Sequence, residues 1–195
     1  MMKKSFIVMI LACLFSANVD AQSKFAINYS FGIPTSETSD LFGETSWRGV
    51  NLDFSYFLEE NIAIGFSGGW QVFDDGLGYV TETDGTETIS GQRYNYLNSV
   101  PLFFTGSYYL NTDAFSPYLS LGIGGVYNQL EEDIGLFSFE EDQLQFALRP
   151  ELGLDYEFYY GFEIRAAVRY HYVFEGGDLP NLSYLGIVLG LVWSN

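Results

Sequence analysis

Charged side chains that could do chemistry recur at alternate or fourth positions, mostly in the last third of the sequence. Side chains at that spacing share one face of a β-strand, where carboxylates and guanidinium groups can pair. The members of this set are Asp53, Arg149, Glu151, Asp155, Glu163, Arg165, Arg169 and His171. They form the candidate site, and the question is whether they act as a gate, as a catalyst or as a packed interior.

The spacing of the charges about a tight-turn signal centred on Tyr160 predicts specific ion pairs. Antiparallel pairing about that point places Asp155 opposite Arg165 and also places Glu151 opposite Arg169. One interpretation is an ion-pair gate that opens to let solutes through. The other is a filled interior whose charges satisfy each other, with a burial cost close to the Coulomb gain.

His171 is the only histidine of the chain, and it is the candidate base for lipid-modifying chemistry. The same register places Arg149 opposite it, and His171-Tyr172-Val173 offers no adjacent serine. A lipid hydrolase would need a nucleophile beside the base. We therefore expect no enzymatic activity and no cofactor, although lipid-modifying catalysis remains the third alternative.

Acidic residues dominate the segments predicted to be long loops, in which the sequence has no lysine or arginine. They are Glu37, Asp40, Glu44, Asp74, Asp75, Glu82, Asp84, Glu87, Glu131, Glu132, Asp133, Glu140, Glu141, Asp142, Glu175 and Asp178. One hypothesis is a divalent-cation site that bridges the loops to lipopolysaccharide phosphates. The other is a solvated, self-repelling surface, because the spacing matches no calcium-loop motif. Between two acidic runs, residues 134–139 form an apolar patch that could contact a partner or cover the barrel mouth.

The elements that must position these charges are strands, because apolar residues alternate with small or polar ones throughout residues 25–193. Eight such segments are separated by connections that are alternately long and short. Residues 34–46, 131–142 and 175–181 are predicted as long loops, and residues 74–92 are predicted as a ribbon that continues two strands. Asp84-Gly85 suits a type I′ hairpin tip. Pro101 and Pro150 each remove one ladder donor, so we expect a bulge or a shift in pairing at each.

The direction of the bulky apolar face indicates whether water or lipid surrounds the barrel. In the last strand, Leu185, Ile187, Leu189, Leu191 and Trp193 share one face, whereas glycine and valine occupy the other. An eight-stranded barrel has an interior only just wide enough for side chains, so the small and charged face fits inside. The bulky face then points outward and needs lipid around it. The sequence thus predicts an all-β fold, an eight-stranded antiparallel up-and-down transmembrane β-barrel.

Aromatic residues support a membrane location because they gather at both ends of the predicted strands, as bilayer interfaces favour. At the short-turn end these are Tyr56, Tyr108, Tyr156, Phe158, Phe162 and Trp193, and at the other end Phe31, Trp47, Trp70, Tyr127, Tyr170 and Tyr172. The alternative is the ordinary strand propensity of aromatics, which would not confine them to the outward face near the ends.

Several segments resemble recurring strands of the small eight-stranded outer-membrane barrels, the porin-like outer membrane β-barrel family that includes the membrane domain of outer membrane protein A. They are residues 96–102 (YLNSVPL), 116–124 (SPYLSLGIG) and 150–156 (PELGLDY). The resemblance covers residues 22–195. It implies that the termini and short turns face the periplasm and that the long loops face outward. It also implies that the last strand, with Tyr184, Gly186, Leu189 and Leu191, is read by the barrel-assembly machinery, although Ser194 and Asn195 follow the terminal aromatic.

The first residues predict export. Lys3 and Lys4 precede a short apolar run, and Val19-Asp20-Ala21 suits signal cleavage, so we assign residues 1–21 to a signal peptide and residues 22–195 to the barrel domain. Lipidation at Cys13, the only cysteine, is the alternative reading of this segment. The net charge of -17 argues against nucleic acid as a partner.

The sequence therefore predicts a non-catalytic protein of a bacterial outer membrane with a structural or surface-interaction role and acidic extracellular loops. The alternative is a narrow channel for small or hydrophobic solutes. The expected partners are outer-membrane lipids, lipopolysaccharide and the assembly machinery, and the expected state is a monomer.

Overall fold

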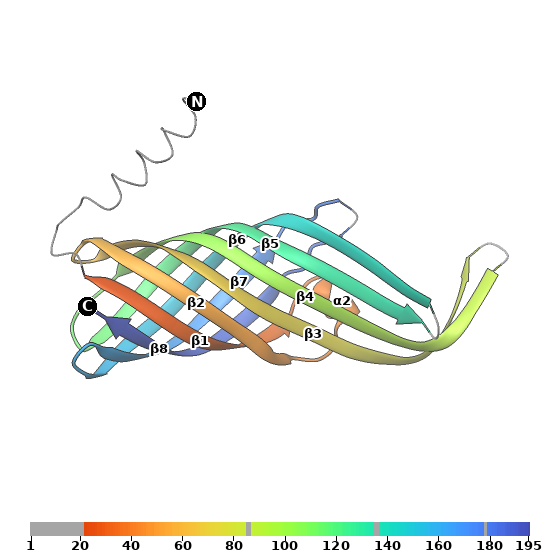
Figure 1. Cartoon of the computed structure of the whole chain (residues 1–195), viewed down its shortest axis with the longest axis horizontal. Helices are drawn as coiled ribbons and strands as arrows, with labels where there is room; N and C mark the ends of the chain where they lie inside the picture. Colours follow the sequence, from red (N-terminus) through yellow and green to blue (C-terminus); the bar gives the residue numbers. More distant parts are fainter. Residues whose placement is uncertain (1–21, 85–86, 135–136, 178) are drawn as a thin grey trace, which may run out of the picture.

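Eight antiparallel strands close into one barrel in chain order, as the sequence predicts (Figure 1). The computed structural model describes residues 22–84, 87–134, 137–177 and 179–195, so the predicted signal peptide and the tip at Gly85 lie outside the described residues. The strands are β1 (Ser23–Pro34), β2 (Ser46–Glu59), β3 (Ile62–Asp84), β4 (Glu87–Tyr109), β5 (Phe115–Ile134), β6 (Phe137–Tyr159), β7 (Phe162–Val173) and β8 (Tyr184–Ser194). One helical turn, α2 (Thr38–Leu41), which the sequence pattern did not predict, lies between β1 and β2.

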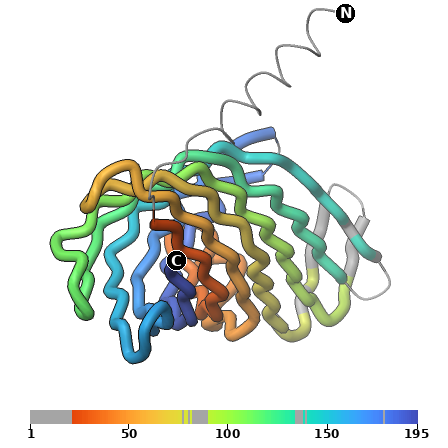
Figure 2. The backbone as a smooth tube through the Cα atoms, turned by 60° about the vertical axis from the view of Figure 1, so that its left-hand side comes forward, coloured from red at the N-terminus to blue at the C-terminus, as the bar shows by residue number. Residues whose placement is uncertain are grey.

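The barrel closes where the first strand pairs with the last. The register between β1 and β8 runs from Lys24↔Ser194 to Pro34↔Tyr184, so the two strands pair along almost their whole length. Figure 2 shows these two strands side by side at the end where the chain terminates. Closure removes the unpaired strand edges that a hydrocarbon environment does not tolerate.

The two faces of the barrel wall divide as predicted, with bulky apolar side chains outside and small or charged ones inside. Along β8 the outward Ile187, Leu189 and Leu191 are exposed, whereas Val188 and Val192 are buried. Inward glycine makes room where side chains from neighbouring strands meet, and a Cβ at Gly190 would collide with Asn28. Among the described residues, no helix combines the length and the hydropathy that a membrane-crossing helix requires.

The predicted aromatic residues lie on the outer wall near both ends of the strands. At the short-turn end, Phe162 and Trp193 pack edge to face, with ring centroids 6.3 Å apart. At the opposite end, Phe31 packs against Trp47 at 5.0 Å. Their position agrees with the predicted interfacial bands.

Four strands, β3 to β6, continue beyond the barrel as a sheet at the end that carries the long connections, which we call the long-loop end (Figure 1). The ribbon predicted over residues 74–92 is confirmed. The loop predicted over residues 131–142 is wrong, because β5 runs to Ile134 and β6 starts at Phe137. Cross-strand pairs such as Glu131↔Glu140 continue the ladder through the acidic runs. Strong pairing on the β4 side holds β5 in strand geometry, an effect that composition alone did not indicate.

The two mid-strand prolines do not shift the register, contrary to expectation. Pro101 pairs with Val126, and Pro150 pairs with Leu121, both in β5. On the other side of each proline, the ladder is interrupted towards β3 and towards β7 and then resumes in unchanged register. A proline whose missing N–H faces one neighbour leaves the pairing to the other neighbour intact. The bulges lie instead at Ser30/Gly32, Phe57/Glu59, Gly76/Gly78 and Glu157/Tyr159.

Candidate functional site

The predicted charged side chains gather inside the barrel, where each is at most 6% exposed. They are Asp53 from β2, Arg149, Glu151 and Asp155 from β6, and Glu163, Arg165, Arg169 and His171 from β7. Alternation along each strand turns all of them inward, so three strands separated in sequence contribute to one layer, which we call the ionic belt. The structure therefore brings the eight predicted residues together in one lumen, and the geometry of their contacts bears on whether they form a gate, a catalyst or a packed interior.

Arg165 is the centre of the part of the ionic belt that lies nearer the short turns. Its Nε and Nη2 donate to the two carboxylate oxygens of Asp155 at 2.8 and 2.9 Å, and its Nη1 lies 3.2 Å from Asp53. The Asp155↔Arg165 register pair is the one predicted. A bidentate contact of this kind fixes both side chains, because the planar guanidinium matches the carboxylate.

Arg169 is the centre of the part of the ionic belt that lies nearer the long-loop end. It pairs with Glu151 across β6 and β7, as predicted, with Nε 2.8 Å from Oε2. Its Nη2 also contacts Asp53, so this carboxylate joins both arginines. Arg149 extends the network, with Nη2 3.4 Å from Glu151 and Nη1 donating to Ser67 Oγ at 2.7 Å.

Lys24 belongs to the ionic belt, although it was not predicted. Its Nζ donates to Glu163 at 2.6 Å and to Asp155 at 3.3 Å. It also lies 4.8 Å from the centre of the Tyr109 ring, which lines the interior beside it. Lys24 shares the face of Ala26 and Asn28 on β1, so the alternation of the first strand could have identified it. With Lys24 included, four cations face four carboxylates, and His171 adds an imidazole.

The surroundings of His171 do not form a catalytic constellation. Its ring stacks on Tyr184 with centroids 4.2 Å apart and planes at 12°, and Phe103 packs against its edge at 5.7 Å. The guanidinium of Arg149 lies 4.8 Å from the centre of the Phe103 ring. Within the described residues, none of these neighbours is a nucleophile positioned by a base, which acyl-transfer chemistry would require. The arrangement resembles side-chain packing more than an active site.

The space left inside the belt is small. A void of about 40 Å³ borders Lys24 and Glu163 at the short-turn end. A smaller one, of about 10 Å³, has Asp53, Ser67, Tyr118, Glu151 and Arg165 in its lining. That volume holds about one water molecule. Tyr118 helps to fill the lumen, since its hydroxyl donates to Glu151 at 2.6 Å and the Arg165 guanidinium lies 5.0 Å from its ring centre. The geometry is that of a filled interior.

A second layer closes the barrel at the long-loop end, and we call it the apolar cap. Its members are Phe42, Phe73, Leu97, Leu130, Leu179, Leu182 and Tyr184, with Leu41 packed against them. Two neighbouring connections contribute Phe42, Leu179 and Leu182 to the cap, the segment around α2 and the β7–β8 connection, which flank the paired strands β1 and β8. Strands β3, β4, β5 and β8 supply the other members. Hydrogen bonds join the two connections, with the Thr35 amide donating to the Ser183 carbonyl at 3.1 Å and the Asn181 amide to Glu37 at 3.1 Å.

Buried amides anchor the cap to the wall. Gln145 Nε2 donates to the carbonyls of Phe174 and Pro180 at 2.9 and 2.8 Å, and Asn95 Nδ2 donates to the Leu41 carbonyl at 3.1 Å. These bonds satisfy backbone carbonyls that burial would otherwise strand. The cap is therefore an ordered part of the wall, and it lies above the ionic belt in the same lumen.

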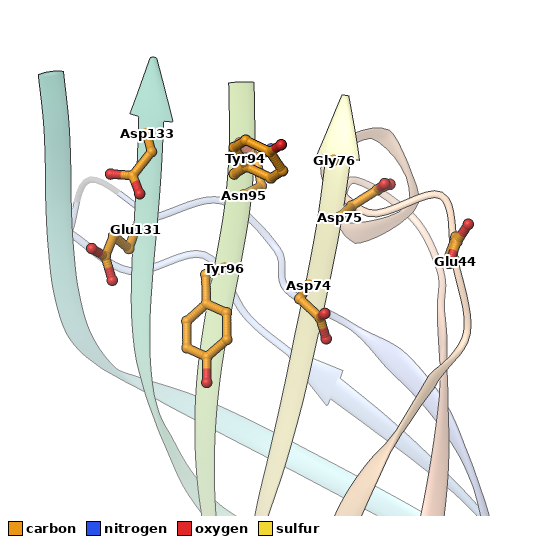
Figure 3. Close-up of a pocket in the computed structure, with 9 residues that line it drawn as sticks. All are labelled: Glu44, Asp74, Asp75, Gly76, Tyr94, Asn95, Tyr96, Glu131 and Asp133. Carbon is orange, nitrogen blue, oxygen red and sulfur yellow. The ribbon is translucent and has the colours of Figure 1, made fainter. Parts of the chain in front are cut away.

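The sheet that projects from the long-loop end carries an acidic, tyrosine-lined hollow of about 580 Å³ (Figure 3). Its lining residues are Glu44, Asp74, Asp75, Gly76, Tyr94, Asn95, Tyr96, Glu131 and Asp133. Figure 3 shows that they come from three neighbouring strands and from the connection that bears Glu44. Within the part of the chain that the structure describes, no three His, Cys, Asp or Glu side chains lie close enough to hold a metal ion.

Two arginines lie near the acidic segments predicted to be free of basic residues, Arg48 on β2 and Arg93 on β4 of the projecting sheet. Arg48 Nη1 lies 3.3 Å from Asp74, and its guanidinium is 5.9 Å from the centre of the Tyr96 ring. Arg93 Nη2 lies 2.7 Å from Glu132. The extension of β4 beyond the barrel brings Arg93 to the same surface as the acidic runs, and Arg48 reaches Asp74 from the neighbouring strand β2. The surface is therefore predominantly acidic with two basic residues paired into it.

Comparison with known proteins agrees with the barrel architecture described above. The family model described as "Outer membrane protein beta-barrel domain" matches residues 5–194. No curated protein sequence matches the chain. Among solved structures, Ail of Yersinia pestis, crystallised with the heparin analogue sucrose octasulfate, is similar at 16% identity and TM-score 0.57, covering 91% of this chain and 100% of Ail.

Two further structures show the same architecture. The outer membrane protein OprG of Pseudomonas aeruginosa is 17% identical with TM-score 0.55, covering 90% of this chain and 96% of OprG. A major outer membrane protein of Thermus thermophilus is 11% identical with TM-score 0.53, covering 89% of this chain and 99% of that protein. At these identities the likeness concerns the fold.

Proposed function

The chain belongs to the outer membrane protein β-barrel family and is an outer-membrane protein, and from this premise we propose that it is a non-catalytic, non-conducting barrel that acts by surface interaction. The observation that carries the proposal is the filled lumen. The voids beside the ionic belt measure about 10 and 40 Å³, and the apolar cap lies in series with the belt. A solute would have to displace both layers to cross.

The second part of the proposal concerns the projecting sheet, which we assign to the outside of the cell. Strands β3 to β6 carry it beyond the barrel, and its surface is acidic and hollowed. Loops and extensions on a rigid scaffold are where binding residues concentrate. The barrel wall then serves as the membrane anchor, and the sheet is the part that meets other molecules.

The charge of the sheet restricts its ligands. The similar Ail protein was crystallised with a polyanion, sucrose octasulfate. On the present chain a polyanion would face Glu131, Asp133, Glu140 and Asp142, and like charges at such distances repel. We therefore propose that the ligand carries positive charge.

The remaining partners follow from the membrane location and stay proposals. Outer-membrane lipids and lipopolysaccharide would contact the exposed apolar wall. The assembly machinery would read β8, whose pattern includes Tyr184, Gly186, Leu189 and Leu191. A monomer is supported by closure of the barrel within one chain.

The test of the proposed function is ion conductance of the mature protein refolded into a planar bilayer. We expect a silent barrel whose mobility on gels still depends on boiling, which shows that the silent protein is folded. Steady conductance of the wild-type protein would overturn the proposal and favour a narrow channel, with the ionic belt as its gate. An Arg165→Ala/Arg169→Ala variant, measured in parallel, would then show increased conductance.

A further inference from the structure

One edge of the projecting sheet carries backbone groups without a strand partner. Strand β7 ends at Val173, which pairs with Ala147, and the amide of Phe174 makes one more bond, to the Phe146 carbonyl at 3.0 Å. Beyond this point β6 continues to Phe137 and pairs with β5 alone among the described residues. Figure 1 shows β5 and β6 projecting past the end of β7.

The direction of the unpaired backbone groups follows from the strand geometry. In an antiparallel ladder, each residue directs its N–H and its C=O to the same side, and successive residues alternate. The Phe146 carbonyl points towards the β7 side. The backbone groups of Ser138, Glu140 and Asp142 therefore point towards the open side, whereas those of the intervening residues bond to β5.

The opposite edge of the same sheet, formed by β3, is less suitable as a template. The register of β3 shifts between Gly76 and Gly78, and bulges twist an edge away from regular pairing. The connection after β1 also lies against this edge, where the amide of Gly43 donates to Asp75 at 2.6 Å. The regular edge is that of β6, which pairs with β5 without a register shift over its length.

The acidic side chains of the β6 edge favour pairing with a strand that carries positive charge. Glu140, Glu141 and Asp142 are exposed, and Glu140 lies directly opposite Glu131 of β5. A second copy of this edge would bring acidic residues against acidic residues, and like charges on paired strands destabilise the pairing. A strand with lysine or arginine at alternate positions would place its cations beside these carboxylates.

We propose that the β6 edge over residues 138–144 binds an extended, basic segment of another protein by strand addition. In this mode main-chain hydrogen bonds supply affinity and side-chain charge supplies specificity. The inference deepens the proposed function and rests on it, since it names the binding edge and the chemistry of the partner.

The probe is a synthetic peptide of about seven residues with alternating lysine and valine, close to the usual length of a strand. Binding is measured by fluorescence anisotropy to the mature protein in lipid nanodiscs. A matched peptide with N-methyl groups on alternate backbone nitrogens keeps the charge but cannot complete the ladder. We expect the unmodified peptide to bind at least about tenfold more tightly, because the methylated one loses the main-chain bonds. Equal binding of the two peptides would overturn the proposal and indicate attraction by charge alone.

The matched protein variants are Asp142→Pro and Asp142→Ala. Both remove one carboxylate, but only proline removes the N–H that points to the open side. Pro150 occupies the same parity on β6 without a register shift, so the fold should accept proline at residue 142. We expect Asp142→Pro to bind the peptide several-fold more weakly than Asp142→Ala. Equal affinity of the two variants, in protein whose gel mobility still depends on boiling, would count against strand addition.

Peptide binding and ion conductance, measured on the same protein, separate the proposed binding edge from the proposed function. A silent barrel that binds neither peptide would overturn the β6 edge as the binding site and leave the proposed surface role standing. A conducting wild-type barrel would overturn the proposed function, whatever the peptides do.

Discussion

At the scale of single residues, the ionic belt is a set of buried charges that have partners on several strands. Asp53 contacts both Arg165 and Arg169, so one carboxylate from β2 joins two guanidinium groups from β7. The Coulomb attraction in such a network roughly offsets the cost of burying the ions. The belt therefore contributes little net stability, but the loss of one member leaves a buried charge without its partner.

Replacement of Arg165 by leucine tests this account. The change removes the bidentate partner of Asp155, so we expect a loss of about 3–5 kcal/mol in the free energy of unfolding. Denaturant unfolding followed by tryptophan fluorescence in detergent micelles measures it. The control is Arg48→Leu, which breaks the exposed pair with Asp74 and should cost less than about 1 kcal/mol. Equal unfolding midpoints for wild type and Arg165→Leu would contradict the pairing.

Replacement of Leu121 by lysine tests the outward face. Leu121 lies in the middle of the wall portion of β5 and is exposed on the outside. A lysine at the bilayer midplane costs about 2–4 kcal/mol, so we expect impaired insertion into lipid vesicles, measured as the folded fraction on unboiled gels. Leu58→Lys, at the turn between β2 and β3, is the control and should insert normally. If both variants insert equally well, the assignment of the wall faces is wrong.

At the scale of elements, some neighbouring strands pack closely because one strand has a glycine where a large side chain of the next strand lies over it. A Cβ on Gly153 of β6 would collide with the ring of Tyr118 on β5. That ring lies between Glu151 and Arg165 and fills the lumen. Glycine at this position is therefore required by the close approach of an inward aromatic side chain.

The variant Gly153→Ala should destabilise the barrel by about 1–3 kcal/mol, because the added methyl group displaces Tyr118 in a filled interior. Gly106→Ala is the matched control, since its Cβ would meet nothing within 4 Å. Both free energies come from the same denaturant titration. A cost at Gly106 as large as that at Gly153 would mean that the loss of stability at Gly153 does not arise from displacement of Tyr118.

In the molecule as a whole, two layers of side chains fill the lumen. The ionic belt lies inside the barrel, and the apolar cap lies at the long-loop end. The two layers come from different parts of the chain. The belt is made by side chains of β1, β2, β6 and β7, and the cap is made by two hydrogen-bonded connections together with inward side chains of β3, β4, β5 and β8. Because the layers act in series, removal of one leaves the other in place.

The combined variant Phe42→Ala/Leu182→Ala/Arg165→Ala/Arg169→Ala tests closure in series. We expect steady conductance in a planar bilayer from this variant, whereas the cap pair and the arginine pair should each remain nearly silent. Boiling-dependent gel mobility of all three variants provides the control for folding. Full conductance from the arginine pair alone would mean that the cap does not close the mouth.

The amino-acid pattern was enough to predict the eight strands of the barrel wall, their inward and outward faces and two ion pairs within the β6–β7 hairpin. Alternation with a period of two assigns Leu189 to the lipid face and Val188 to the lumen, because successive side chains on a strand point in opposite directions. The tight turn at Tyr160 fixes the register of β6 against β7. Local geometry therefore sufficed for Asp155 opposite Arg165 and for Glu151 opposite Arg169.

Contacts between segments that are distant in sequence could not be predicted from the local pattern and are seen in the closed barrel. Asp53 reaches Arg169 and Lys24 reaches Glu163 because barrel closure brings β1 and β2 against the interior face of β7, and local alternation does not encode distances across the lumen. The acidic run near Glu131 is a strand because its neighbours pair with it, which overrides a composition typical of loops. The apolar cap likewise depends on two connections that are far apart in sequence and adjacent only after closure.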